Sequence, residues 1–249
     1  MKGSVVQRAA LNRDITIYLP PSYPKDNVRY PVVYVQDGGH LFNPQQNDAL
    51  ARLEQGVANG EAEELILVGI EPNNRNDEYT PWKAKALVDK FADFGGMGSE
   101  YLSFLVNELK PYIDQEYVTN PNGETTGIIG ASFGGLISIY AAYLYPNVFG
   151  KIGALSASFW YEGFLEYMQS EDIRETDRRI YMYVGTSEGV NKGTIQEGMV
   201  ARTRSAHDLL SSCGFTKDRL KFVEEVGGTH DWSYFFQRFP EALQWLFKK

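Results

Sequence analysis

The amino-acid sequence predicts an α/β fold in which a mostly parallel central sheet is covered by helices on both faces. Strand-like and helix-like segments alternate through most of the chain, as they do in consecutive strand–helix–strand units. Two near-continuous apolar runs, residues 30–36 and 64–70, suit central strands that are buried on both faces. No internal repeat, low-complexity tract or linker interrupts the 249 residues, so we expect a single domain over residues 1–249.

The beginning of the chain is expected to add antiparallel strands, since residues 15–19 alternate in polarity and end at a Pro-Pro pair. Residues 71–98 are polar, aromatic and irregular, and a connection of this length in a compact domain is usually functional. A helix is predicted to begin at Ser99 as its N-cap. Further strands are predicted at residues 126–130, 151–157, 179–185 and 220–226, and further helices at 136–145, 194–213 and 232–247.

Charge and composition exclude several classes of function. The formal net charge is −8 and the isoelectric point is about 5.0, whereas binding to nucleic-acid phosphates needs a basic face. No stretch stays apolar over the roughly 18 residues of a membrane span, and the N-terminus lacks the apolar region of a signal peptide. Cys213 is the single cysteine, so no intrachain disulfide forms. We therefore expect a cytoplasmic protein that binds neither nucleic acid nor membrane.

The sequence Gly-x-Ser-x-Gly, which is typical of a nucleophilic serine in a tight strand-to-helix turn, occurs twice. At Ser132 an apolar strand precedes the motif, an apolar helix follows it, and small residues flank the serine. At Ser187 a strand precedes the motif, but irregular residues follow and only one further strand remains. We therefore predict Ser132 as the nucleophile. The alternative for Ser132 is a glycine-rich turn without chemistry.

A serine hydroxyl becomes an effective nucleophile when a base takes its proton, and histidine titrates near neutral pH. The chain has three histidines. His40 precedes the predicted nucleophile, and His207 falls in the middle of a predicted helix. His230 follows the last strand, at the carboxyl edge of the sheet where ligands bind in such folds, and it fits the chain order of serine, acid, histidine. We predict His230 as the general base, against a structural capping histidine.

The acid of such a triad should lie between the nucleophile and the base, directly after the carboxyl end of a strand. Glu188 directly follows the strand predicted at residues 179–185. Asp208 lies in the middle of a helix, and Asp231 would have to bend back to reach the adjacent histidine. Glutamate has the charge of aspartate and a longer reach, so we predict Glu188 as the acid. The alternative is an ordinary surface carboxylate.

A tetrahedral oxyanion is stabilised by preorganised hydrogen-bond donors. One donor in this type of turn is the backbone N–H after the nucleophile, here that of Phe133. The other comes from the loop after an early strand, where the glycines of residues 37–40 let the backbone approach a substrate. We predict the N–H of Gly39 as this donor, with that of His40 next. The alternative is a simple Gly-Gly turn.

Short motifs occur along nearly the whole chain in the order found in one enzyme family. They are YVQDG at residues 34–38, EYTPW at 78–82, YLSFL at 101–105, ELKP at 108–111, GASFGG at 130–135, SASFW at 156–160, GTSE at 185–188 and HDW at 230–232. With these motifs the chain resembles the putative-esterase family of α/β-hydrolases, which includes enterochelin-type siderophore esterases, feruloyl esterases, esterase-D-like enzymes and mycolyltransferases. The resemblance implies the α/β-hydrolase fold, a Ser132–Glu188–His230 triad, no metal and no cofactor.

The SASFW and HDW motifs resemble most the siderophore-esterase branch, which implies cyclic trilactones or aryl esters as substrates. Aromatic rings are expected to stack on catechol or cinnamoyl groups, and Arg75 is expected to meet a carboxylate or catecholate. The predicted substrate-binding residues are His40, Arg75, Trp82, Trp160 and Trp232.

The predicted function is that of a serine carboxylic-ester hydrolase that acts on a small-molecule ester through an acyl-enzyme. Two alternatives remain at this point: a thioesterase or acyltransferase of the same fold, and a non-catalytic binding protein on a hydrolase scaffold. Three dispersed histidines without HExxH-like spacing argue against a metal-dependent hydrolase.

Overall fold

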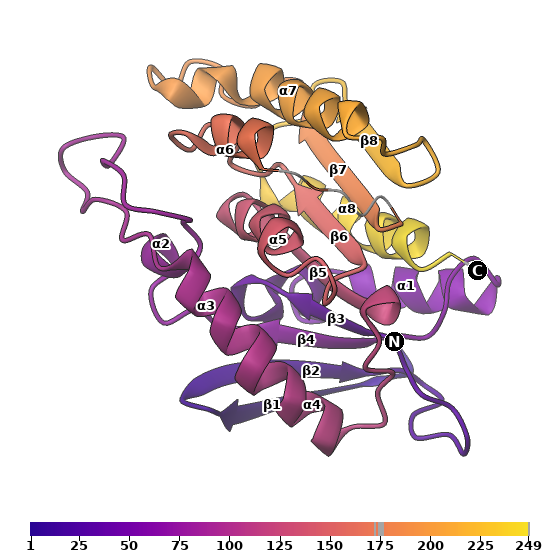
Figure 1. Cartoon of the computed structure of the whole chain (residues 1–249). Coiled ribbons are helices and arrows are strands. Elements are labelled where there is room, and N and C mark those ends of the chain that lie inside the picture. Colours follow the sequence, from indigo (N-terminus) through magenta and orange to yellow (C-terminus); the bar gives the residue numbers. More distant parts are fainter. Residues whose placement is uncertain (172, 174–176, 249) are drawn as a thin grey trace.

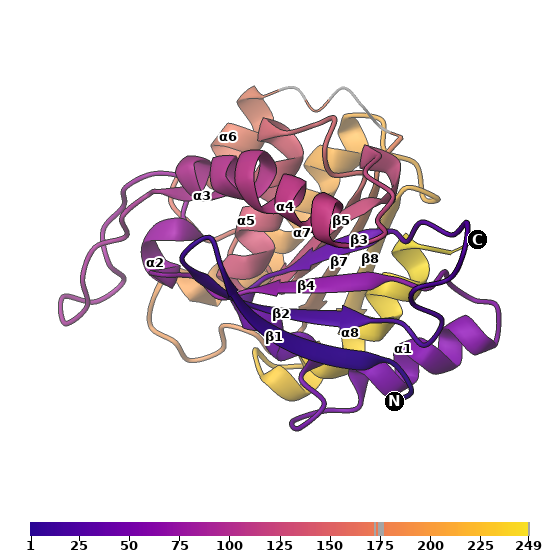
Figure 2. The same ribbon diagram turned by 90° about the horizontal axis from the view of Figure 1, so that it is seen from below.

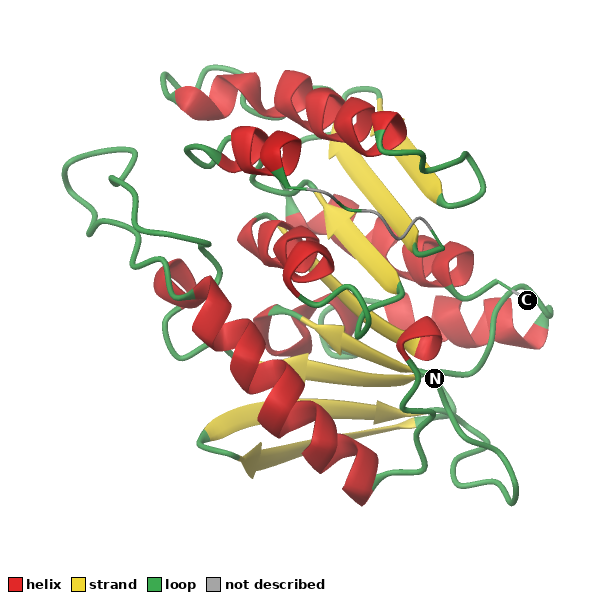
Figure 3. Ribbon diagram, viewed as in Figure 1, coloured by secondary structure: helices red, strands yellow, loops and turns green. Residues whose placement is uncertain are grey.

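A twisted central sheet organises the chain in the computed structural model, which describes residues 1–171, 173 and 177–248 (Figures 1 and 3). Within these residues, eight strands form one sheet in the order β1-β2-β4-β3-β5-β6-β7-β8. The strands are β1 (Ser4–Ala10), β2 (Arg13–Leu19), β3 (Val32–Val35), β4 (Ile66–Ile70), β5 (Thr126–Ala131), β6 (Lys151–Leu155), β7 (Arg179–Gly185) and β8 (Leu220–Glu225).

The sheet is parallel except at its N-terminal side. β1 pairs with β2, and β2 with β4, in antiparallel fashion, whereas β4, β3, β5, β6, β7 and β8 are mutually parallel. The predicted class, with antiparallel strands first and a mostly parallel sheet after them, is therefore confirmed. The carboxyl ends of the six parallel strands share one edge, and the loops at this edge carry the predicted site residues.

Helices cover both faces of the sheet and bury a separate core on each (Figure 2). One face carries α3 to α7, and the other carries α1 and α8, which pack against each other. The helices are α1 (Ala49–Ala58), α2 (Arg75–Glu78), α3 (Gly98–Phe104), α4 (Lys110–Glu116), α5 (Phe133–Leu144), α6 (Phe164–Ser170), α7 (Met199–Ser212) and α8 (Trp232–Leu246). None of the helices in the described ranges is long and apolar enough to cross a membrane.

The helix that precedes β5 differs from the sequence prediction at its start. Met97, not Ser99, is the N-cap of α3, because the Ser99 hydroxyl donates to the Glu100 carboxylate at 2.7 Å instead of capping the backbone. The helix then widens into a π-helical turn, Leu105–Leu109, before α4 continues it with Pro111 in its first turn. A proline lacks the N–H for an i→i−4 bond, which gives a physical reason for the irregular turn before it.

The long segment at residues 71–98 is irregular apart from the single turn of α2. Its distal part is a narrow loop, closed where the N–H of Phe94 donates to the carbonyl of Ala84 at 2.9 Å. Lys85 and Asp93 form an exposed ion pair at 2.8 Å within this loop. Figure 1 shows that the loop projects from the body of the molecule between α2 and α3, on the side opposite the two chain termini.

Candidate active site

Ser132 lies in the turn between β5 and α5, with φ of 58° and ψ of −120°. Positive φ is uncommon for a residue with a side chain and marks a turn held by its surroundings. The neighbouring glycines are required by close packing. A Cβ on Gly130 would lie 2.5 Å from the carbonyl carbon of Gly134, and a Cβ on Gly134 would lie 2.9 Å from the Cβ of Gln36. This geometry presents the Ser132 hydroxyl at the carboxyl edge of the sheet.

Ser187 occupies a different kind of turn. It follows β7, its N–H donates to the carbonyl of Gly228 at 2.9 Å, and the chain stays irregular until Thr194 caps the turn that precedes α7. The second Gly-x-Ser-x-Gly sequence is thus part of the loop that carries Glu188, and it lacks the strand-to-helix geometry seen at Ser132.

Glu188 and His230 meet at the carboxyl edge of the sheet, from the loops after β7 and β8. Glu188 Oε2 lies 2.8 Å from His230 Nδ1. The Glu188 side chain has an exposed fraction of 0%, whereas that of His230 is 32% exposed, so the pair has one dry end and one end open to solvent. A buried carboxylate in this position fixes the orientation of the imidazole and stabilises its protonated form.

The other oxygen of Glu188 is held by two donors. Ser156 Oγ donates to Oε1 at 2.5 Å, and the N–H of Gly185 donates to the same oxygen at 2.8 Å. Both oxygens of the buried carboxylate therefore have partners, as an ionised buried group requires. No role for Ser156 was predicted from the sequence, although Ser156 begins the SASFW motif at residues 156–160.

Within the part of the chain that the structure describes, the Ser132 hydroxyl is hydrogen-bonded to Ser158 Oγ at 3.4 Å and not to His230. Ser158 is fully buried, and its N–H donates to the carbonyl of Ser132 at 3.1 Å. Contacts between a nucleophile and its base are often long in free enzymes and shorten when substrate binds. The Ser132 hydroxyl thus has Ser158, and not the predicted base, as its hydrogen-bond partner in this structure.

Asp231 and Asp208, the other carboxylates considered for the acid, do not contact the predicted base through their side chains and are engaged elsewhere. Asp231 is the N-cap of α8, where its Oδ1 accepts bonds from the N–H and the hydroxyl of Ser233 at 2.9 and 2.6 Å. These hydrogen bonds lower the pKa of Asp231. Asp208 lies on an exposed face of α7 beside His207, at 3.2 Å.

The loop after β3 has three consecutive residues in the left-handed region. Their φ values are 60° at Asp37, 62° at Gly38 and 81° at Gly39. A Cβ on Gly39 would lie 2.6 Å from the Phe42 ring, and one on Gly69 would lie 2.5 Å from the Cα of Gly39. The Asp37–Gly39 loop is therefore packed tightly onto the end of β4, and Phe133 begins α5 directly after Ser132.

Arg75 is engaged within the protein. Its Nε and Nη2 donate to the Asp37 carboxylate at 2.6 and 3.1 Å, and Nη2 also reaches the carbonyl of Ala131 at 3.3 Å. Burial acts to lower the pKa of Arg75, but the hydrogen bond and charge of Asp37 raise it above its ordinary value. The structure therefore places Arg75 at the junction of the Asp37–Gly39 loop and the turn of Ser132, and its guanidinium already holds a carboxylate.

The three predicted tryptophans lie in different surroundings. Trp160 is 4% exposed and packs on Phe133, with ring centroids 5.3 Å apart. Trp82 donates through its indole N–H to the carbonyl of Glu162 at 2.8 Å and stacks on the first residue of α6. Trp232 begins α8, is 36% exposed, and packs edge-on against the ring of His40, with centroids 4.3 Å apart. Trp232 and His40 thus form the more open aromatic surface.

Two cavities of the molecule are lined by neither Ser132 nor Glu188 nor His230. A cleft of about 640 Å³ lies along the Asp37–Gly39 loop and is lined also by His40, Thr16 and Glu71. Burial, with the charges of Asp37 and Asp14, raises the pKa of Glu71 in this cleft. Within the described residues, no group of three or more His, Cys, Asp or Glu side chains is suited to hold a metal ion.

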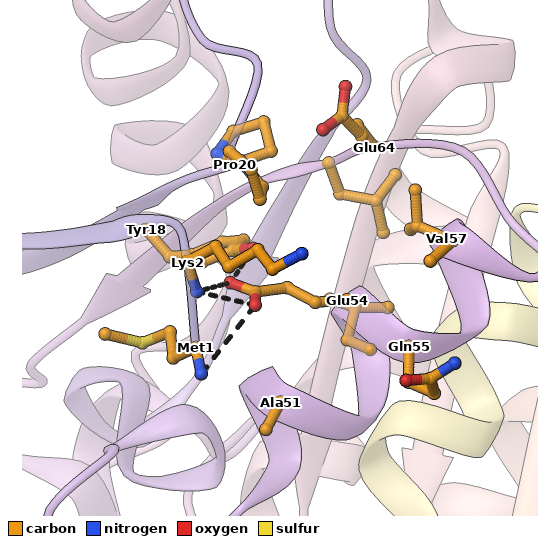
Figure 4. A pocket seen from close by; sticks show the side chains of 13 residues that line it. Met1, Lys2, Tyr18, Pro20, Ala51, Glu54, Gln55, Val57 and Glu64 are labelled. Atoms are coloured by element: carbon orange, nitrogen blue, oxygen red, sulfur yellow. Dashed lines mark hydrogen bonds and ion pairs between the residues drawn. The ribbon is translucent and has the colours of Figure 1, made fainter.

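A second cavity, of about 450 Å³, lies at the opposite edge of the sheet, where β2 ends and β4 begins (Figure 4). Glu54 accepts hydrogen bonds there from the backbone N–H groups of Lys2 and Gly3, at 2.7 to 2.9 Å, and its Oε2 lies 3.8 Å from the amino group of Met1. Glu54 therefore holds the N-terminus at this cavity, and neither Ser132 nor His230 lines it.

Known proteins resemble the chain over 78% to 100% of its length. The uncharacterized protein YbbA of Bacillus subtilis is 44% identical over 249 residues, covering 100% of this chain and 98% of that protein. An endo-1,4-beta-xylanase/feruloyl esterase of Xylanibacter ruminicola is 28% identical over 219 residues, covering 78% of this chain and 27% of that protein. The enterobactin esterase of Shigella flexneri, in a crystal structure obtained in the presence of enterobactin, matches with a TM-score of 0.76 at 16% identity, covering 99% of this chain and 58% of that one.

The last of these likenesses confirms the expected α/β-hydrolase fold. The sequence model of the family described as "Putative esterase" matches residues 8–246. The chain therefore belongs to this family, and it is a carboxylic ester hydrolase, as its motifs predicted.

Proposed function

We propose that the chain is a serine esterase with Ser132 as nucleophile, His230 as general base and Glu188 as the acid that orients the base. The observation that carries this proposal is the 2.8 Å contact between the buried Glu188 carboxylate and His230 Nδ1, at the same edge of the sheet as the strained turn of Ser132. This geometry leaves the other nitrogen of the imidazole, Nε2, to take the serine proton.

The proposed reaction has two steps. Ser132 Oγ attacks the ester carbonyl while His230 takes its proton, and the N–H groups of Gly39 and Phe133 stabilise the oxyanion. His230 then gives the proton to the departing alcohol, which leaves an acyl-enzyme on Ser132. Water, activated by His230, attacks the acyl-enzyme and releases the acid.

We propose small aromatic esters as substrates, of the feruloyl type or of the siderophore trilactone type. Two observations support this class. Relatives are named as a feruloyl esterase and an enterobactin esterase, and the open surface of Trp232 and His40 offers rings on which an aromatic group can stack.

The test of the nucleophile is labelling with a fluorophosphonate probe. We expect the wild type and the Ser187→Ala variant to be labelled and Ser132→Ala not to be labelled. Loss of labelling in a folded Ser187→Ala variant would show that the other motif carries the nucleophile. A wild type that does not react would favour a binding protein on a hydrolase scaffold.

The test of the substrate class is a comparison of feruloyl, catechol-bearing and short alkyl esters, each with and without an added alcohol. The proposal expects higher kcat/KM for the aromatic esters and release of the free acid in the presence of the alcohol. Formation of a new ester with the added alcohol would instead identify an acyltransferase, and a preference for thioesters would identify a thioesterase.

A further inference from the structure

Ser156 is a buried serine that contacts the proposed acid and lies outside the proposed triad. Its side chain is fully buried, and its Oγ is 2.5 Å from Glu188 Oε1. The N–H of Gly185 donates to the same oxygen at 2.8 Å, while Oε2 is bonded to His230 at 2.8 Å. With two donors on one oxygen, the carboxylate cannot rotate without breaking hydrogen bonds in a dry environment, where an unpaired polar group is costly.

The backbone at Ser156 is strained in a way that serves this contact. Its φ is 47°, in the left-handed region, which costs a residue with a side chain on the order of 1 kcal/mol or more. Its N–H donates to the carbonyl of Tyr183 at 2.8 Å, which extends the pairing of β6 with β7 by one residue. Glycine would adopt this φ without penalty, so the backbone conformation alone does not call for a serine, whereas the contact with Glu188 needs a hydroxyl.

The same short segment also contacts the proposed nucleophile. Ser132 donates its N–H to the carbonyl of Leu155 at 2.9 Å, and the N–H of Ser158 donates to the carbonyl of Ser132 at 3.1 Å. Residues 155–158, at the end of β6, therefore connect the turn of Ser132 with the loop of Glu188. That turn follows β5 and that loop follows β7, the two neighbours of β6 in the sheet.

We propose that Ser156 is a positioning residue of the esterase: by holding Oε1 of Glu188 it fixes the other oxygen on His230 and so orients the base. This inference rests on the triad proposed above. Partners of this kind, one contact removed from the reacting atoms, orient a catalytic side chain and cost activity when removed.

The first experiment compares kcat and KM for Ser156→Ala and Ser156→Gly on an aryl ester. We expect both variants to lose kcat by about 10-fold with KM nearly unchanged, since the geometry of the base is disturbed and the substrate surface is not. Glycine relieves the strain at this φ, so Ser156→Gly should be at least as stable as Ser156→Ala and equally impaired. Recovery of kcat in the glycine variant would mean that activity follows stability, and the proposal would be wrong.

A matched control is Thr203→Val in α7. Thr203 is also buried, at 1% exposed, and its hydroxyl donates to the carbonyl of Met199 at 2.9 Å, within the same helix. This variant loses a buried hydroxyl without touching the site, so its kcat should equal that of the wild type. A loss as large as that of Ser156→Ala would show that any buried hydroxyl has this effect.

A double-mutant cycle with Glu188→Gln tests whether Ser156 acts through the acid. We expect the loss of kcat caused by Ser156→Ala to disappear in the Glu188→Gln background, because the step on which Ser156 acts is already lost. Additive losses would overturn the positioning role. If Glu188→Gln alone left kcat unchanged, the proposed triad itself would fail. If Glu188→Gln lowered kcat and both Ser156 variants did not, the inference about Ser156 alone would fail.

Discussion

Arg75 holds Asp37 by two hydrogen bonds, from Nε to Oδ1 at 2.6 Å and from Nη2 to Oδ2 at 3.1 Å. Asp37 begins the left-handed Asp37–Gly39 loop, and Nη2 of Arg75 also reaches the carbonyl of Ala131, the residue before Ser132. One guanidinium thus ties the loop proposed to form the oxyanion hole to the turn of the proposed nucleophile. We therefore expect the distance between the two proposed oxyanion donors, the N–H groups of Gly39 and Phe133, to depend on Arg75.

We predict that Arg75→Lys lowers kcat by about 10-fold or more, because an ammonium keeps the charge and loses the planar two-point geometry. The measurement is kcat and KM on an aryl ester, with a urea unfolding curve for stability. Arg52→Lys is the control, since Arg52 reaches Glu241 at 3.4 Å in a partly exposed pair, and its activity should not change. Wild-type kcat in a folded Arg75→Lys variant would show that the Asp37–Gly39 loop keeps its position without the two hydrogen bonds from the guanidinium.

Gly39 and Gly60 form a natural pair for testing the oxyanion loop. Their φ values are 81° and 79°, so alanine at either position costs about 1 kcal/mol in backbone strain. At Gly39 the new Cβ would also lie 2.6 Å from the Phe42 ring, whereas at Gly60 nothing lies within 4 Å. We expect Gly60→Ala to lower stability slightly with kcat unchanged, and Gly39→Ala to lower kcat by more than 10-fold. Equal kcat values in the two variants would argue against a donor at Gly39.

Much of the sheet was predictable because its strands are apolar runs between turn residues. The strand at residues 179–185 has the predicted bounds, and the other parallel strands differ by only a few residues. Helix α1 was not predicted, and Gly56 within it has a low helix propensity. The structure explains that glycine by packing: a Cβ there would lie 2.1 Å from Gln244 Nε2 of α8. The contact between Gly56 and Gln244 joins residues far apart in the sequence, so no local sequence pattern predicts it.

The site residues divide in the same way. The proposed triad of Ser132, Glu188 and His230 was predicted from motif, chain order and loop position, all of which can be read from the sequence. The roles proposed for Arg75 and Ser156 rest on contacts made only by the folded chain, with Asp37 and Glu188 respectively. From the sequence, Arg75 was expected to meet a carboxylate or catecholate of a substrate. Its guanidinium has the predicted kind of partner, but that partner belongs to the protein.

Trp232 provides a test of the proposed preference for aromatic esters. It is 36% exposed beside His40, whereas Trp160 is 4% exposed and packed on Phe133. We predict that Trp232→Ala raises KM for a feruloyl ester several-fold and leaves KM for an acetyl ester unchanged, because only the aromatic group loses a stacking partner. Trp160→Ala should instead lower the free energy of unfolding by about 3–5 kcal/mol. An equal change in KM for both esters would refute the stacking role.

We expect Lys151 to make the stability of the protein depend on pH in the alkaline range. It begins β6 directly opposite Arg179 of β7, and burial, followed by the charges of Arg179 and Arg219, lowers its pKa to about 8 from the ordinary 10.5. Between these two pH values the unfolded chain binds more protons at this group than the folded chain does. The contribution of Lys151 to the free energy of unfolding therefore rises with pH through this window. Below pH 8 the lysine is charged in the folded state, and its destabilising effect is largest.

We predict that Lys151→Met is more stable than the wild type at pH 7, because it removes a partly buried charge that faces two arginines. The advantage of the variant should shrink steadily as the pH is raised from about 8 towards 10.5, where the lysine becomes neutral in both states. Urea unfolding of both proteins at several pH values gives this difference directly, and other alkaline effects cancel in the comparison. Lys217→Met, at an exposed turn, is the control and should show a difference that does not vary with pH. A constant difference for Lys151→Met as well would mean that the gain comes from apolar packing and not from the removed charge.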